Sequence, residues 1–400
     1  MPHTHAPRNE PLPGIANIVA IGSGKGGVGK STVAVNLALA LARAGHRVGL
    51  VDTDVLGPSV PGMLGLTFGE PPKASPDGKL LPTEVHGIEC VSMGLLRSDD
   101  EPAIMRGPMV TKYLQMFLAQ VAWGELDFLV LDLPPGTGDT QLTLAQSVQL
   151  TGAVIVTTPQ DVSLKIARRG LRMFEKVSVP ILGIVENMGT FTCPHCGSTT
   201  DVFSHGGGSR MARELGVPYL GSLPLDPAVV DSGDTGTPIV VAAPESVSAL
   251  AYGSIAEELV AQAEGRGAAG MRPFAWNWDT DEGAPEWAES SGGEADTPVG
   301  LRARDQRTLE VSWADGRIDA LDVRDLRLAC PCAQCVEEMS GEALLDPATV
   351  PADVHPRRIT SVGTYAMIID WSDGHGTGIY THAYLRRLAE HLAASVSEEV

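Results

Sequence analysis

Eight consecutive residues near the N-terminus have the types and spacing that bind the phosphates of a nucleotide. They are, in order, Gly24, Lys25, Gly26, Gly27, Val28, Gly29, Lys30 and Ser31. The run fits the pattern G-x-x-x-x-G-K-[ST], in which glycines let backbone N–H groups face phosphate oxygens. The pattern assigns Lys30 to the β- and γ-phosphates and the Ser31 hydroxyl to Mg²⁺. Thr32, which begins the helical pattern after the run, completes the predicted contacts around the phosphates.

Three aspartates follow apolar runs that are typical of buried strands. Asp132 comes directly after the apolar residues 128–131, and Asp52 and Asp54 follow another such run. A carboxylate at the tip of a central strand can hold Mg²⁺ through water. The segment 133–139, Leu-Pro-Pro-Gly-Thr-Gly-Asp, has the composition of a loop that senses the γ-phosphate. We therefore expect the three carboxylates to converge on the phosphate loop.

Five of the six cysteines fall in two clusters, which favours metal binding over disulfides. Cys193 and Cys196 form a C-x-x-C pair, whereas structural zinc and a [4Fe–4S] cluster each take four ligands. Cys90 stands alone and is expected to be a buried core thiol. Two subunits would bring four sulfurs together at a symmetry axis. A zinc ion shared between subunits and a redox-active pair are the alternatives, and His195 is expected not to be a ligand.

The second cluster has the spacing C-x-C-x-x-C and is formed by Cys330, Cys332 and Cys335. Three thiolates lack one ligand of a closed tetrahedral site, and His375 is the predicted fourth. Cys₃His is a common zinc set, so Zn²⁺ is the expected ion. His382 is the alternative fourth ligand, and an iron–sulfur cluster is the alternative to zinc.

The elements that must position these residues are visible in the periodicity of the chain. From residue 15 to about 265, strand-like apolar runs alternate with helical ones, which predicts an α/β fold with a parallel sheet and helices on both faces. The expected strands cover 15–21, 47–52, 128–133, 153–158, 181–186 and 219–223. A small α+β domain is expected from residue 298 onward, with alternating strand-like segments at 308–313 and 365–371.

Length and composition limit the domain plan and the partners. The 400 residues predict a disordered tail over 1–14, a phosphate-loop domain over 15–265, an acidic flexible linker over 266–297 and a small domain over 298–395. Trp276, Trp278 and Trp287 lie in the linker and are expected to pack on a neighbouring domain. The net charge of −20 supplies no basic face for nucleic acid, and no apolar run indicates a membrane segment or a signal peptide. We expect a cytoplasmic protein.

The motifs together resemble one family. The loop with its additional Lys25 is similar to the deviant phosphate loop of SIMIBI-class P-loop ATPases. Residues 15 to about 262 resemble the Mrp/Nbp35/ApbC iron–sulfur cluster carriers, whose motifs occur here in the same order. They are D-x-D-x-x-G-P-S at 52–59, R-G-P-M at 106–109, D-L-P-P-G-T-G-D at 132–139, T-T-P-Q-D at 157–161, E-N-M at 186–188 and C-P-H-C-G at 193–197.

This resemblance implies an ATP-hydrolysing homodimer. In the family, Lys25 would cross to the partner's nucleotide, Asp52 would support Mg²⁺ and Asp54 would orient the attacking water. Asn187 and Asp226 would lie near the adenine.

The resemblance further implies that a labile [4Fe–4S] cluster bridges the two C-x-x-C pairs. It would be received from assembly scaffold proteins and passed to apo-proteins. A positioning ATPase of the MinD/ParA type and a zinc-binding regulatory ATPase scaffold are the alternative functions.

The C-terminal region resembles a second family. Residues 298–390 are similar to the small N-terminal domain of γ-butyrobetaine hydroxylase, which carries a zinc site of this kind. Too little chain follows His382 for the iron site and barrel of the oxygenase part. We therefore expect no oxygenase activity.

Overall fold

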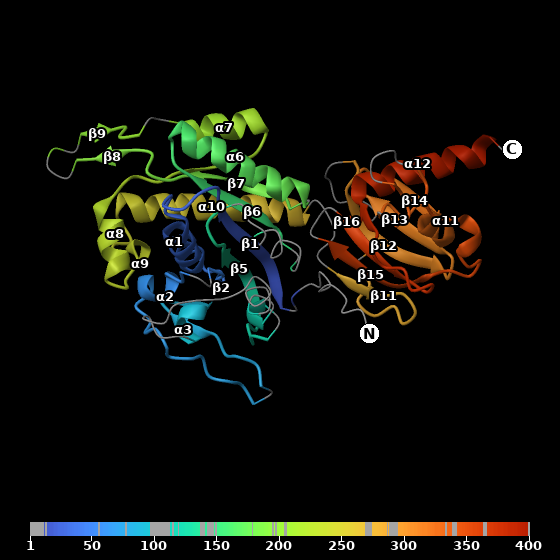
Figure 1. Ribbon diagram of the computed structural model, residues 1–400, viewed down its shortest axis with the longest axis horizontal. Coiled ribbons are helices and arrows are strands. Elements are labelled where there is room, and N and C mark those ends of the chain that lie inside the picture. The colour runs from blue at the N-terminus through green and yellow to red at the C-terminus, as the bar shows by residue number, and fades with distance from the viewer. Residues whose placement is uncertain are drawn as a thin grey trace. The chain divides into compact units, whose positions relative to one another are not determined.

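The computed structural model of the protein contains two compact units, Leu12–Ala263 and Glu264–Val400. Figure 1 shows the ribbon of both. The structure describes residues 12, 14–54, 57–76, 78–96, 113, 116–118, 120–136, 141, 148, 150–177, 179–193, 196, 198–203, 206–268, 274–285, 287, 295–332, 334–337, 342–362 and 366–398. The predicted R-G-P-M motif at 106–109, the end of the predicted γ-phosphate loop at 137–139 and His195 lie outside the described residues.

The first unit is built on an eight-stranded sheet in the order β10-β7-β6-β1-β5-β2-β4-β3. All neighbouring strands run parallel except β3, which is antiparallel to β4. The strands are β1 (Ile15–Ser23), β2 (Val48–Asp52), β3 (Thr83–Val85), β4 (Ile88–Ser92), β5 (Leu126–Asp132), β6 (Gly152–Thr157), β7 (Ile181–Glu186) and β10 (Tyr219–Ser222). The predicted parallel α/β fold is confirmed, and the sheet extends beyond the six predicted strands by β3 and β4.

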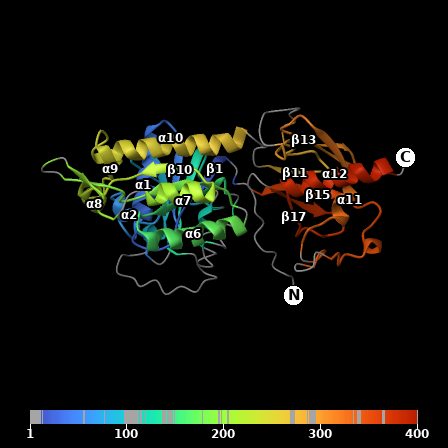
Figure 2. The ribbon, with the colours of Figure 1, turned by 90° about the horizontal axis from the view of Figure 1, so that it is seen from above.

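Helices cover both faces of this sheet, as Figure 2 shows for α10 and α6 on opposite sides. Side chains alternate along a strand, so Val19 and Ile21 of β1 pack in one core cluster while Ile18 and Ala20 pack in the other. The helices are α1 (Lys30–Arg43), α2 (Val60–Met63), α3 (Met93–Leu96), α6 (Asp161–Lys176), α7 (Gly207–Leu215), α8 (Pro227–Asp234), α9 (Ile239–Ala242) and α10 (Val247–Ala268). None of the helices in the described residues is long and apolar enough to span a membrane.

A short two-stranded hairpin follows β7. It consists of β8 (Phe191–Thr192) and β9 (Thr199–Thr200), which pair in antiparallel register. Cys193 and Cys196 lie in the loop that joins these two strands.

The second unit contains two antiparallel sheets. One has the order β11-β15-β16-β17 and the other β12-β13-β14. Its strands are β11 (Ala275–Asn277), β12 (Pro298–Asp305), β13 (Thr308–Trp313), β14 (Ile318–Asp322), β15 (Pro356–Val362), β16 (Ala366–Trp371) and β17 (Ile379–Thr381). The helices α11 (Val323–Leu328) and α12 (His382–Glu398) and the short 3-10 helix η1 (Pro347–Thr349) complete it.

Part of the segment predicted as a linker belongs to the second unit. β11 pairs with β15, and Trp276 and Trp278 lie in the core of this unit. The ring of Trp287 lies under the Arg302 guanidinium, 4.2 Å from its carbon. The acidic, Gly/Ser-rich composition of 266–297 predicts a linker, but a strand of three residues forms at the sheet edge because the buried Trp276 ring helps to fill the core.

Candidate functional site

The glycine-rich loop joins the end of β1 to the start of α1. Gly27 and Gly29 have φ angles of 77° and 78°, a left-handed conformation that side chains other than glycine rarely adopt. A Cβ at Gly24 would lie 2.5 Å from the carbonyl carbon of Ile166 in α6. The glycines therefore serve both the turn and the close packing of the loop against a neighbouring helix.

Lys30 is buried at the start of α1, with 7 % of its surface exposed. Its ammonium lies 2.5 Å from Asp132 Oδ1 and donates to the Ser31 hydroxyl over 3.1 Å. Lys30, which is predicted to bind phosphate, thus contacts both Ser31 and Asp132, which are predicted to hold Mg²⁺.

Asp52 and Asp132 occupy paired positions at the ends of β2 and β5. Asp132 Oδ2 is buried and has no hydrogen-bond partner among the described residues. Burial raises the pKa of the Asp132 carboxyl, and the Lys30 ammonium opposes part of the rise. Burial, and after it the Asp132 charge, raise the pKa of Asp52 to about 7. Two adjacent carboxyl groups with an unpartnered oxygen are a donor set that fits Mg²⁺.

Asp54 lies half-buried just beyond Asp52. Its Oδ1 accepts from the Gly57 backbone N–H over 3.1 Å, and its own N–H donates to Asp52 Oδ1 over 3.1 Å. Asp54 thus lies next to Asp52, which the strand register places beside Asp132.

Lys25 differs from Lys30 in its surroundings. It is half-buried, and the Ser23 hydroxyl donates to its carbonyl oxygen over 3.0 Å. Among the described residues, no hydrogen bond or ion pair of the Lys25 ammonium is found. The side chain is therefore not committed to the described part of its own subunit.

The two predicted adenine contacts make other bonds in this structure. Asn187, directly after β7, donates from Nδ2 to the Val28 carbonyl oxygen of the phosphate loop over 2.9 Å. Asp226 caps α8 by accepting from the Ala228 N–H over 2.9 Å, and it also accepts from the Ser248 hydroxyl over 2.5 Å. Asn187 thus lies against the nucleotide loop, whereas both oxygens of Asp226 already have partners.

Cys193 and Cys196 lie at the tip of the β8–β9 hairpin. Cys196 is exposed and Cys193 is half-buried. The hairpin is closed by the Cys193 N–H, which donates to the Ser198 carbonyl oxygen over 3.0 Å. Hydrogen bonds from Ser198 and then from Cys193 lower the pKa of the Cys196 thiol. With one thiol exposed and the other half-buried, the pair offers two sulfur ligands at the tip of the hairpin.

The second cysteine cluster is complete within one chain. Its four ligand atoms, from Cys330, Cys332, Cys335 and His375, all lie within 4.8 Å of one another. His375 Nε2 lies 3.1, 3.5 and 3.8 Å from the three sulfur atoms, in that order. Burial lowers the pKa of His375, which favours the neutral, ligating imidazole. His382, the alternative ligand, is not part of this cluster; it begins α12, and burial lowers its pKa to about 4.

A buried arginine, which no motif indicated, links the two parts of this cluster. Arg327 is 5 % exposed, and its guanidinium donates to Asp373 Oδ2 over 2.8 Å and to Cys335 Sγ over 3.6 Å. Asp373 Oδ1 accepts from the His375 N–H over 3.0 Å. An arginine in a short helix carries no sequence signal for this role, because the contact depends on how α11 packs.

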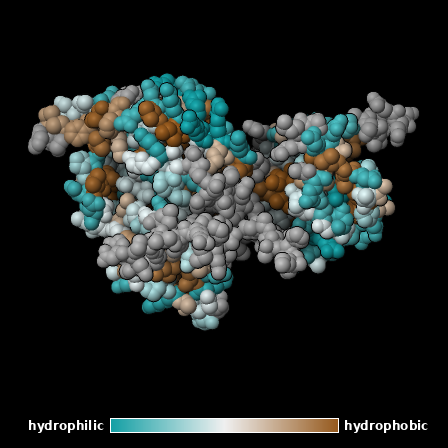
Figure 3. Space-filling view, viewed as in Figure 1, coloured by the Kyte–Doolittle hydropathy of each residue, from teal (hydrophilic) through white to brown (hydrophobic). Residues whose placement is uncertain are grey.

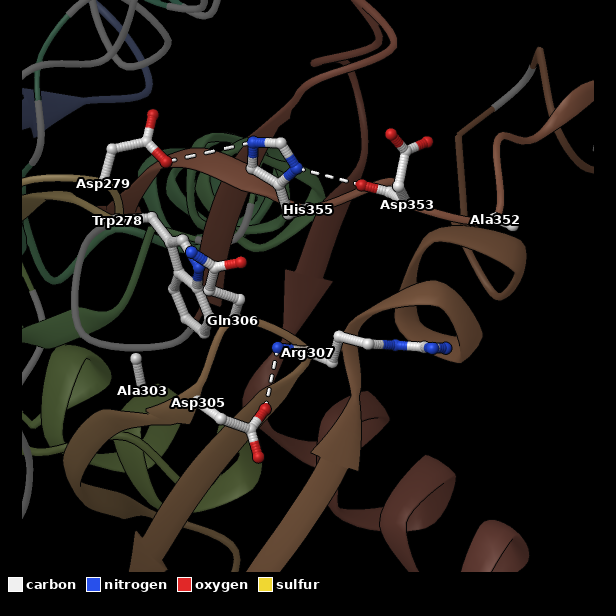
Figure 4. A pocket seen from close by; sticks show the side chains of 9 residues that line it. All are labelled: Trp278, Asp279, Ala303, Asp305, Gln306, Arg307, Ala352, Asp353 and His355. Carbon is white, nitrogen blue, oxygen red and sulfur yellow. Dashed lines mark hydrogen bonds and ion pairs between the residues drawn. The ribbon is translucent and has the colours of Figure 1, made fainter.

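A cavity elsewhere in the second unit has a volume of about 470 Å³, and Figure 4 shows the side chains that line it. The His355 imidazole lies 3.9 Å from Asp279 and 3.0 Å from the Asp353 carbonyl oxygen. The Arg307 backbone N–H donates to Asp305 over 2.8 Å. None of these residues belongs to a predicted site, and the groups that line the cavity largely bond one another. The lining comprises Trp278, Asp279, Ala303, Asp305, Gln306, Arg307, Ala352, Asp353 and His355.

Models of known protein families match parts of both units. The family model of the NUBPL iron-transfer P-loop NTPases matches residues 14–260, which include both. The chain belongs to this family. A second model, of the γ-butyrobetaine hydroxylase-like N-terminal domain, matches residues 301–386.

Related proteins cover the same region. The iron–sulfur cluster transfer protein NUBPL of Dictyostelium discoideum is 49 % identical over 253 residues, which are 63 % of this chain and 78 % of that protein. An iron–sulfur cluster carrier protein of Synechocystis is 54 % identical over 248 residues, 61 % of this chain and 70 % of the relative. A nucleotide-binding protein from Archaeoglobus fulgidus, solved with ADP, has a TM-score of 0.51 and 39 % identity over 56 % of this chain and 88 % of that chain.

Proposed function

We propose that this protein is an ATP-dependent iron–sulfur cluster carrier. It holds a labile [4Fe–4S] cluster between two subunits and passes it to apo-proteins. The observation that carries the proposal is the Cys193–Cys196 pair, with Cys196 exposed, at the tip of a hairpin on a P-loop NTPase unit. Two thiols are half of the four that such a cluster takes, so a second copy of the hairpin supplies the rest. The names of the relatives support the cargo.

The homodimer is supported by two further features. The Lys25 ammonium has no partner within the described part of its own chain and is free to reach the nucleotide of a second subunit. Apolar side chains are also exposed on the first unit, including Val202 and Phe203 after β9, 47 % and 36 % exposed, and Val247 of α10, 76 % exposed. Figure 3 shows hydrophobic surface at the hairpin end of this unit. Association of two copies would cover such surface.

ATP hydrolysis follows from the residues around the loop. Lys30 exchanges Asp132 for the β- and γ-phosphates and compensates their charge. Ser31, Asp52 and Asp132 would hold Mg²⁺, which, when bound, neutralises charge on the transferred phosphoryl group. Asp54 orients the attacking water, and Lys25 of the second subunit stabilises the charge that develops. The hydrolysis step would change how firmly the two hairpins share the cluster.

The remaining assignments are part of the same proposal. The cluster is received from assembly scaffold proteins in the cytoplasm and delivered to apo iron–sulfur proteins there. The Cys₃His group of the second unit holds Zn²⁺, because four ligands from one chain form a closed structural site.

Anaerobic reconstitution with iron and sulfide tests the carrier function. The full-length protein is expected to gain the broad visible absorption of an iron–sulfur cluster, and Cys193→Ala/Cys196→Ala is expected to lose it. The matched control is Cys332→Ala, which removes a thiol of the second cluster and should keep the absorption. Loss of the absorption only in Cys332→Ala, or no absorption in the wild type, would contradict the proposal.

A further inference from the structure

A segment of eight residues contacts the phosphate loop and leads to the cysteine pair. They run from Glu186, the last residue of β7, to Cys193 in the hairpin loop, and all of them are described. Glu186 itself is 1 % exposed and accepts from the Gly208 N–H over 2.5 Å at the start of α7. The segment therefore begins at a fixed point in the core of the first unit.

The first contact is made by Asn187, which is 8 % exposed. Its backbone N–H donates to the Thr157 carbonyl oxygen over 2.8 Å, and its Nδ2 donates to the Val28 carbonyl oxygen over 2.9 Å. A Cβ at Gly29 would collide with this Nδ2 atom, so the loop lies directly against the amide. A movement of the phosphate loop on phosphate binding would displace the Asn187 side chain, because its amide is buried and directly hydrogen-bonded to the Val28 carbonyl.

The next residues fix the direction of the segment. The Asn187 side-chain oxygen accepts from the Met188 N–H over 3.0 Å, and Met188 has a left-handed φ of 60°. The Gly189 N–H donates to the Leu223 carbonyl oxygen over 2.9 Å. A Cβ at Gly189 would collide with the Ser222 hydroxyl of β10. The chain thus turns sharply and passes close to the end of β10, with no space for a side chain.

The last contacts set the base of the hairpin. The Leu225 N–H donates to the Thr190 carbonyl oxygen over 2.7 Å, and Phe191 forms an isolated bridge with Leu225. The Cys193 N–H then closes the hairpin loop. Each residue from Asn187 to Cys193, apart from Thr192, is therefore held by a hydrogen bond or bridge given above, and these contacts link the phosphate loop to the cysteine loop.

We propose that Asn187 and Gly189 are positioning residues that join the cysteine hairpin to the phosphate loop, so that nucleotide bound at the loop restrains the hairpin. Coupling of two sites requires an element that both of them bias, and residues 186–193 contact both. A nucleotide fixes the loop, the loop fixes the Asn187 amide, and the hairpin loses mobility. The inference rests on the proposed function for its purpose, since it describes how nucleotide state reaches the cluster ligands.

The experiment measures alkylation of the Cys196 thiol in the full-length protein freed of metal. The probe is MgADP, which fills the loop without a γ-phosphate, at a concentration that saturates each variant. Peptide mass spectrometry separates Cys196 from the other cysteines, and hydrogen exchange of residues 190–200 is followed in parallel. MgADP is expected to slow alkylation of the wild type at least about fivefold, the lower end of typical coupling between sites.

Two variants interrupt the segment at different points. Asn187→Ala removes the amide that contacts Val28, and Gly189→Ala forces the segment away from β10. Both are expected to show the same alkylation rate with and without MgADP. Gly189→Ala/Ser222→Ala removes the collision and should restore the response. Asn277→Ala, the same change as at Asn187 but in the second unit, should respond like the wild type.

The outcomes separate this inference from the carrier function. An unchanged MgADP response in both Asn187→Ala and Gly189→Ala overturns the inference, as does a wild-type hairpin that ignores MgADP. Either result leaves cluster binding in the reconstitution experiment untouched. Conversely, a wild type that responds to MgADP but takes up no cluster retains the coupling and removes the proposed cargo.

Discussion

Lys25 and Lys30 lie in the same loop but have different surroundings. Lys30 is buried and contacts Asp132, which is the arrangement of a residue that acts on its own subunit's nucleotide. Lys25 is half-buried, and its ammonium makes no hydrogen bond or ion pair with the described residues of its own chain. At the residue scale, this difference leads to a prediction that can be tested by mixing variants.

Lys25→Ala is expected to lower ATP hydrolysis by about 10³-fold, because a cationic side chain supplied in trans contributes on this order. Binding of MgADP should change little. In a mixture of Lys25→Ala with Lys30→Ala, heterodimers contain one site that has both lysines. Steady-state phosphate release should therefore recover in part. A mixture no more active than its components would show that Lys25 acts within its own subunit.

Arg327 gives a second prediction at this scale. Removing a group that orients a metal ligand costs about 10- to 100-fold in metal affinity. Arg327→Gln is expected to weaken Zn²⁺ binding at Cys335 and His375 by that factor, measured by competition with a chromophoric chelator. The control is Arg304→Gln, whose side chain is 64 % exposed. Equal zinc affinity in both variants would contradict the positioning role.

Contiguous motifs explain which site residues could be predicted from the sequence. The phosphate loop and the C-x-x-C pair carry their chemistry within a few residues, so spacing alone indicates them. Arg327 could not be predicted, because its contacts with Cys335 and Asp373 arise only when α11 and the loop after β16 pack together. The bond from Asn187 to Val28 likewise joins residues that are 159 positions apart in the sequence.

At the scale of elements, the ends of β2 and β5 determine the electrostatics of the nucleotide site. Parallel register places Asp52 beside Asp132, and burial raises the pKa of Asp52 to about 7. Below that pH the folded protein keeps a proton on Asp52, and above it the carboxylate is available to a cation. Protons and Mg²⁺ therefore compete for this pair of strand ends.

The affinity for MgADP is expected to rise between pH 6 and pH 8 by up to about tenfold per unit, the limit for release of one proton. Calorimetric titration measures it. ADP in the presence of a chelator should show no such increase, since an ionised Asp52 repels phosphate. Asp52→Asn should lose the increase that the wild type shows with Mg²⁺. A wild-type affinity for MgADP that did not depend on pH would show that Mg²⁺ binding releases no proton from Asp52.

The contact between the loop and α6 leads to the next prediction. A Cβ at Gly24 meets the α6 backbone at 2.5 Å, whereas one at Gly26 has its nearest neighbour, the Pro135 Cβ, at 3.9 Å. Gly24→Ala is therefore expected to lower the free energy of unfolding by about 1–3 kcal/mol, as overpacking does. Gly26→Ala should leave it nearly unchanged. Thermal unfolding of the nucleotide-free protein compares the two, and equal midpoints would contradict the packing argument.

Periodicity predicts elements best where one element buries a long apolar run. The central strands β1, β5, β6 and β7 are such runs, and their positions agree with the sequence. β3 and β11 have three residues each, too few for a pattern to emerge. Their existence depends on a neighbouring strand that offers hydrogen bonds, which a single segment cannot reveal.

At the scale of the whole molecule, β11 decides where the second unit begins. Composition places the start of the small domain at residue 298, but Trp276 is fully buried and β11 pairs with β15. Trp278, 7 % exposed, lies in the same core. A fragment without these residues exposes core positions and leaves one edge of β15 unpaired.

A fragment of residues 264–400 is accordingly expected to fold with Zn²⁺ and to unfold cooperatively, whereas 298–400 is expected to stay largely unfolded. Loss of one buried tryptophan costs about 3–5 kcal/mol, and a whole domain has only about 5–15 kcal/mol of stability. Near-ultraviolet circular dichroism during heating measures both fragments. Trp276→Ala in the longer fragment is the intermediate case, and its unfolding midpoint should be lower than that of the unsubstituted 264–400 fragment.

The shorter fragment decides the role of β11. If 298–400 unfolded at the same temperature as 264–400, β11 would be an appendage of the second unit, and the acidic segment would act as a linker throughout. If it did not fold, the chain available to connect the two units would be shorter than composition suggests, because β11 would be an integral part of the second unit.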